Sequence, residues 1–165
     1  YNQRREECRQ GVSILRKSFP HVRSLRDASP DQLEAVRPEM PGPLENRCRY
    51  VIEENSRVLK AVKALEQADM QTLGNLLWQT HEGLRTLYEV SCPEIDFLVD
   101  TAMSLPEVAG SRMMGGGFGG CTLNLVREEH TAGVTSHLLS AYRERFGRDA
   151  ESLETGLGDG VRLLP

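Results

Sequence analysis

The residues from Gly115 to Gly120 read G-G-G-F-G-G and constrain this chain more than any other stretch. Glycine has no Cβ, so such a block takes positive φ angles and lets a ligand or another backbone approach its N–H groups. Downstream, Cys121, Leu123 and Leu125 occupy every second position, which is the pattern of a half-buried strand. The sequence therefore predicts a strand, a glycine loop and a second strand. A hairpin that binds no ligand is the alternative interpretation.

Two common phosphate-binding motifs do not describe this block. Gly115, Gly117 and Gly120 match the letters of G-x-G-x-x-G, but that fingerprint requires a helix directly afterwards, and the pattern here is a strand. No Lys-Ser/Thr pair follows the glycines, as a Walker loop would require. Rossmann and P-loop folds are therefore excluded.

Composition narrows the class of protein. The chain has 165 residues, 39% of them hydrophobic, which is enough for a single domain with its own core over 1–165. A net charge of −4 argues against a nucleic-acid partner. Its four cysteines are far apart and are expected to be reduced and mostly buried. No run of eighteen apolar residues indicates a membrane, so a cytoplasmic protein is expected.

Apolar periodicity and helix-capping residues predict an α+β fold, with helices packed on one face of a small antiparallel sheet. Besides the glycine hairpin, the sequence predicts a closing hairpin over Glu151–Leu164. Long helices are expected at Tyr1–Ser18, Leu44–Gln67, Asp69–Tyr88, Pro93–Pro106 and Thr131–Phe146, and a short one at Pro30–Arg37.

Residue types and spacings alone reveal no catalytic apparatus. The four histidines are scattered without metal-ligand spacing, so they are expected to face solvent or to be satisfied in the core. Cys92 precedes Pro93 and is better explained as a helix-entry residue than as a nucleophile. No metal ligand and no catalytic residue is predicted in this chain.

Three stretches together resemble the galactokinase family of the GHMP small-molecule kinases. They are Y-N-Q-R-R-E-E-C at Tyr1–Cys8, Y-E-V-S-C-P-E-I-D at Tyr88–Asp96, and G-S-R-M-M-G-G-G-F-G-G-C-T at Gly110–Thr122. The glycine block is shared by the wider superfamily, whereas the first two stretches look specific to galactokinases. The resemblance implies the GHMP C-terminal domain, a ferredoxin-like fold.

Each matching stretch implies a role. Tyr1 resembles a tyrosine that reaches the bound galactose. The block of Gly115, Gly116, Gly117, Phe118, Gly119 and Gly120 resembles the third GHMP motif, beside the nucleotide-phosphate loop. The stretch Tyr88–Asp96 looks like a structural helix entry with no direct chemistry. Met114 stands where the family usually has threonine, so a hydroxyl contact from that position is not expected.

The resemblance also implies what must come from elsewhere. The family's sugar-binding and phosphate-loop motifs are not in this sequence, and the chain opens with Tyr1 rather than Met. The chain is therefore expected to be the C-terminal half of a longer enzyme. Its N-terminal half would hold most of the ATP and Mg²⁺, and the isolated chain would be inactive. Another sugar kinase of the superfamily and a non-catalytic galactose sensor remain as alternatives.

Overall fold

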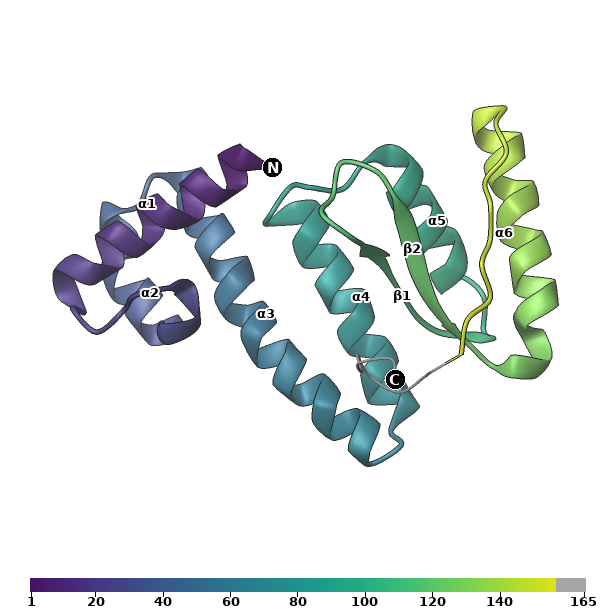
Figure 1. Cartoon of the computed structure of the whole chain (residues 1–165), viewed down its shortest axis with the longest axis horizontal. Helices are drawn as coiled ribbons and strands as arrows, with labels where there is room; N and C mark the ends of the chain where they lie inside the picture. Colours follow the sequence, from purple (N-terminus) through teal and green to yellow (C-terminus); the bar gives the residue numbers. More distant parts are fainter. Residues whose placement is uncertain (157–165) are drawn as a thin grey trace, which may run out of the picture.

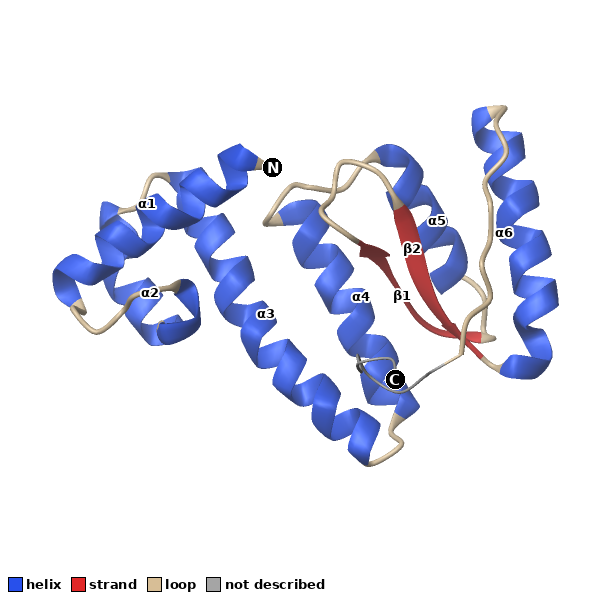
Figure 2. Cartoon of the chain, in the orientation of Figure 1, coloured by secondary structure: helices blue, strands red, loops and turns tan. Residues whose placement is uncertain are grey.

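The computed structural model describes residues 1–156, and helices dominate the chain (Figures 1 and 2). The two strands are β1 (Val108–Met114) and β2 (Cys121–Val126). The helices are α1 (Asn2–Ser18), α2 (Pro30–Val36), α3 (Gly42–Glu66), α4 (Met70–Thr86), α5 (Pro93–Met103) and α6 (Thr131–Phe146). The predicted α+β class and the predicted strand–glycine loop–strand unit are confirmed.

Helix ends follow the capping residues that the sequence provides. The Ser29 side chain accepts a hydrogen bond from the backbone N–H of Gln32, and Pro30 fills the first position of α2. Asp69 accepts in the same way from Thr72 at the start of α4. Gly147 ends α6 in the left-handed conformation, with a φ of +64°.

Helix α3 is the shared wall of two hydrophobic cores. Cys48 and Ile52 pack with α1 and α2 in one core, whereas Tyr50 packs with α4, α5 and β1 in the other. A third, smaller core joins α5, β1 and α6. In Figure 1, α3 accordingly lies between the α1–α2 pair and the sheet with its covering helices.

The apolar residues of α3 recur at helical spacing and form one stripe, but this stripe is buried only in the first half of the helix. Further along, four apolar side chains of the stripe are exposed, and Leu59 is the most exposed of them at 67%. The exposed members are Val58, Leu59, Val62 and Leu65. Ala64, on another side of the helix, is the residue buried at this level. The periodicity is therefore that of a helix, but it does not identify the buried side along the whole length.

The two strands form an antiparallel hairpin, and α4 lies directly against β1. A Cβ built on Gly110 of β1 would meet the Gly74 Cα of α4 at 2.5 Å, so neither backbone leaves room for a side chain. Met114 pairs with Cys121 at the loop end of the hairpin. The hairpin is therefore held from the side by a helix at very close range.

The predicted closing hairpin over Glu151–Leu164 is not seen in the part of it that the structure describes. Residues 151–156 have no regular secondary structure, and the remainder of that prediction lies outside the described residues. Within the described part of the chain, the search for a helix long and apolar enough to cross a membrane finds none.

Candidate functional site

The loop from β1 to β2 is the glycine block, and its backbone is left-handed almost throughout. Gly115, Gly117, Gly119 and Gly120 have φ angles of +93°, +89°, +125° and +109°. Phe118 shares this region with a φ of +63°, which is unusual for a residue with a side chain. The positive φ angles predicted for the block are therefore confirmed, and they explain why glycine fills it.

One side of the block is fastened to the segment between α4 and α5. The backbone N–H of Phe118 donates a hydrogen bond of 2.6 Å to the Val90 carbonyl. A Cβ built on Gly117 would meet both the Cβ and the carbonyl oxygen of Val90 at 2.7 Å. The loop is thus packed on Val90 and held by a hydrogen bond to it.

Three of the other glycines of the loop are open. A Cβ built on Gly115, Gly116 or Gly119 would meet nothing within 4 Å, and the Phe118 side chain is 57% exposed. Backbone N–H groups without flanking side chains are the kind of surface to which a phosphate group can come close. The block therefore combines one anchored side with one accessible side.

A buried arginine ties the anchoring segment to the N-terminal helix. Arg47 of α3 is almost fully buried and donates to the carbonyl of Leu87. Its guanidinium also pairs with Glu89 at 2.5 Å and with Glu7 of α1 at 3.4 Å. Removing one partner of such a buried network would leave a charge uncompensated. Tyr88–Asp96 was expected to be structural, and these contacts agree with that expectation.

His81 of α4 lies beneath the start of the glycine block and is fully buried. Its Nδ1 accepts a hydrogen bond of 3.3 Å from the Met113 N–H, and its Nε2 lies 3.3 Å from Asp96 Oδ1 of α5. Burial lowers the pKa of His81, and the Asp96 carboxylate opposes this in part. The sequence predicts only that His81 faces solvent or is satisfied in the core, although its position between Leu77 and Leu84 is on the apolar stripe of α4.

Tyr1, the predicted sugar-binding residue, immediately precedes α1 and is 69% exposed. In Figure 1 the N-terminus and the β1–β2 loop both lie on the upper side of the molecule. The Tyr1 hydroxyl has no hydrogen-bond partner among the described residues. Tyr1 is therefore available to a ligand, and its role in sugar binding stays a prediction.

The cysteines only partly follow expectation. All four are free thiols, as predicted. Cys48 is buried, and burial raises the pKa of its thiol to about 12, which makes it unreactive. Cys8 and Cys92 are half-buried, but Cys121 is exposed at the start of β2. The prediction of mostly buried thiols is wrong for Cys121, because this strand end has no covering element among the described residues.

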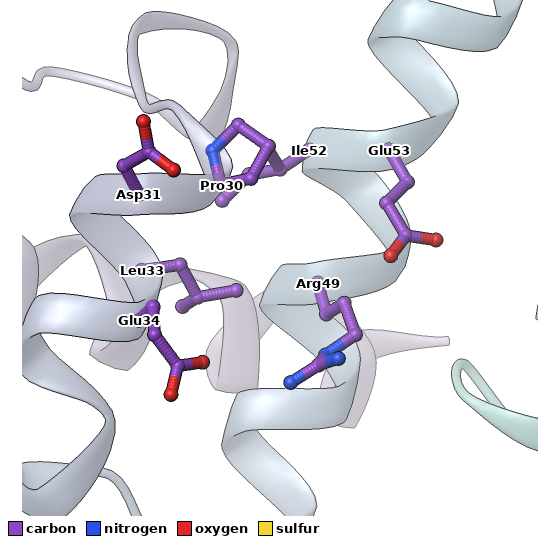
Figure 3. A pocket seen from close by; sticks show the side chains of 7 residues that line it. All are labelled: Pro30, Asp31, Leu33, Glu34, Arg49, Ile52 and Glu53. Atoms are coloured by element: carbon purple, nitrogen blue, oxygen red, sulfur yellow. The ribbon is translucent and has the colours of Figure 1, made fainter.

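A separate hollow of about 210 Å³ lies between α2 and α3, away from the glycine block (Figure 3). Its lining consists of Pro30, Asp31, Leu33, Glu34, Arg49, Ile52 and Glu53. Arg49, its one basic lining residue, already pairs with Glu45 of the same helix. The hollow contains none of the predicted site residues.

Similarity to known proteins defines the class to which this fold and loop belong. The family described as "GHMP kinases C terminal" matches residues 61–143, which is half of the chain and includes α4, the glycine block and most of α6. The chain belongs to this family.

The individual relatives are galactokinases. The galactokinase of Roseiflexus sp. is 46% identical over 98% of this chain and 41% of its own length, and that of Thermotoga maritima is 42% identical over 99% and 44%. The crystal structure of Lactococcus lactis galactokinase complexed with galactose superimposes with a TM-score of 0.86 at 31% identity, over 90% of this chain and 38% of that one. The chain thus spans less than half the length of the curated relatives it matches.

Proposed function

We propose that this chain is the C-terminal part, as a single domain, of a galactokinase, which in full length transfers the γ-phosphoryl group of ATP to the C1 hydroxyl of galactose. The observation that carries the proposal is 46% identity to a galactokinase over 98% of the chain. The anchored yet accessible glycine block supports it, because phosphoryl transfer depends mainly on positioning and on stabilising charge around the transferred group.

In this proposal, Gly115 to Gly120 form one wall of the space for the ATP phosphates, and Tyr1 contacts the sugar. Mg²⁺ is assigned to no residue of this chain, because the family's phosphate-loop motif is not in this sequence. The groups that activate the sugar hydroxyl and hold the metal ion are assigned to the rest of the full-length protein.

The purified 165-residue chain is expected to show no ATP-dependent phosphorylation of galactose, because half of a two-part site cannot position both reactants. Galactose 1-phosphate formation would be measured with the isolated chain and with the full-length protein, after circular dichroism has established that the isolated chain is folded. Turnover that rises in proportion to the concentration of the isolated chain would contradict the assignment.

Tyr1→Phe in the full-length protein is expected to raise the KM for galactose about two- to tenfold and to leave the KM for ATP unchanged. The reason is that phenylalanine keeps the ring but loses one hydrogen bond, worth about 0.5–1.5 kcal/mol. Steady-state kinetics with each substrate varied in turn measures both constants.

Tyr142→Phe is the matched control, since Tyr142 packs on Phe146 of α6, far along the chain from Tyr1. This variant also loses one phenol hydroxyl, but it should change neither the KM for galactose nor the KM for ATP. An unaltered galactose KM in Tyr1→Phe would remove Tyr1 from the sugar site.

A further inference from the structure

His81 joins three elements at one buried point. Its ring belongs to α4, its Nδ1 accepts from the Met113 N–H of β1, and its Nε2 faces Asp96 in the first turn of α5. The contact with Asp96 is 3.3 Å long and does not have hydrogen-bond geometry, so the bond to Met113 is the directed interaction of the ring. An amide N–H can only donate, which requires Nδ1 to be unprotonated. The ring is therefore neutral, with its proton on Nε2.

The hydrogen bond from Met113 to His81 is matched by a second close contact between the same helix and strand, the approach of Gly74 in α4 to Gly110 in β1. Gly74 and His81 are seven residues apart on α4, a rise of about 10.5 Å. Gly110 and Met113, their respective neighbours on β1, are three residues apart, which is about 10 Å along a strand. The helix and strand therefore run alongside each other, and the His81 bond is the second of two fixed points, at the end nearer the loop.

The same network reaches the opposite anchor of the loop. The Ser91 hydroxyl donates a hydrogen bond of 2.5 Å to Asp96 Oδ1, the carboxylate oxygen that faces His81. Ser91 directly follows Val90, whose carbonyl accepts from Phe118. Beneath the loop, the His81 ring that accepts from Met113 thus lies 3.3 Å from the Asp96 carboxylate that Ser91 holds.

We propose that His81 is a positioning residue of the phosphate site: it holds the Met113 amide and, through Asp96 and Ser91, sets where the glycine block lies relative to Val90. The expected effect of His81 on turnover rests on the proposed function, whereas its effect on the position of the loop does not. His81 touches no reactant in this proposal. Its effect on turnover comes from the accuracy with which the loop is held.

Two amide substitutions in the full-length protein separate this role from simple packing. In His81→Asn the side-chain oxygen takes the place of Nδ1 and can still accept from Met113. In His81→Gln the amide reaches the place of Nε2, so the acceptor for Met113 is lost. His137→Gln, at an exposed position of α6, is the surface control. Hydrogen exchange of the Met113 and Phe118 amides, followed by mass spectrometry, and the kinetic constants for both substrates are measured for each variant.

We expect His81→Gln to speed exchange at Met113 about two- to tenfold and to lower kcat by a similar factor, with the galactose KM unchanged. His81→Asn should stay close to the wild type in both the exchange rate at Met113 and kcat. Equal values for the two variants, whether both normal or both impaired, would overturn the proposal, because the acceptor would then not be the cause.

Ser91→Ala serves if His81→Gln does not fold, since it removes the bond to Asp96 without changing the core. It should speed exchange at Phe118, and an unchanged rate there would equally overturn the proposal. If the unaltered full-length protein does not phosphorylate galactose, the proposed function fails, but the exchange rates still decide the role of His81.

Discussion

Gly117→Val in the full-length protein is expected to lower kcat/KM for ATP at least about thirtyfold. The new side chain would have to adopt a φ of +89°, which costs a residue with a Cβ roughly 1–2 kcal/mol. Its Cβ would also lie 2.7 Å from Val90, so the loop must leave its anchor, at a further cost of about 1–3 kcal/mol. Steady-state kinetics at varied ATP concentration gives the ratio.

Gly116→Val separates the two properties of the block, namely its attachment to Val90 and the access of a ligand to its open side. A Cβ on Gly116 meets nothing within 4 Å, so this variant should keep the loop on Val90 and the stability of the wild type. A loss of ATP affinity in a Gly116→Val protein that is otherwise normal would place the ligand on the open side of the block. Near-normal turnover in Gly117→Val would instead show that the loop is only a connection between strands.

Gly110→Val is expected to destabilise the fold by about 3 kcal/mol or more, at the upper end of what overpacking causes. The reason is that its Cβ would meet backbone atoms of Gly74, at 2.5 Å from Cα and 2.7 Å from the carbonyl oxygen. A flexible side chain could move aside, but the helix backbone of α4 cannot do so without leaving β1. The midpoint of urea denaturation measures the loss.

The matched control is Gly133→Val in α6, where a Cβ meets nothing within 4 Å. Valine has a somewhat higher helix propensity than glycine, so the free energy of unfolding should stay within about 0.5 kcal/mol of the wild type. Similar denaturation midpoints for the two variants would mean that α4 and β1 are not in this close contact.

The elements that the sequence predicted well have strong local causes. The start of α2 follows from Ser29 and Pro30, and the end of α6 follows from Gly147. The strand–loop–strand unit follows from the glycine run and the alternation that comes after it, although Cys121 and Leu123 of that alternation are exposed. These signals act between residues close in the chain, and periodicity and turn chemistry are sufficient to detect them.

What remained undetected depends on contacts between distant residues. Arg47 looks like any charged helix residue until Glu7, Leu87 and Glu89 surround it, from 40 or more positions away. The exposed face of α3 shows the same difficulty, because an apolar stripe indicates a helix but not which neighbour covers it. The proposed function came from the resemblance of three stretches to galactokinases and not from any recognisable set of catalytic residues.

The arginine network also bears on how a two-part enzyme could move. Arg47 links the Tyr1-bearing helix to Glu89, and the neighbouring Val90 holds the glycine block. On the proposed assignment, the residue that meets the sugar and the loop that meets the phosphates thus belong to one rigid body. A hinge between this domain and the rest of the enzyme could open or close the cleft, yet the spacing between these two contacts would travel with this domain unchanged.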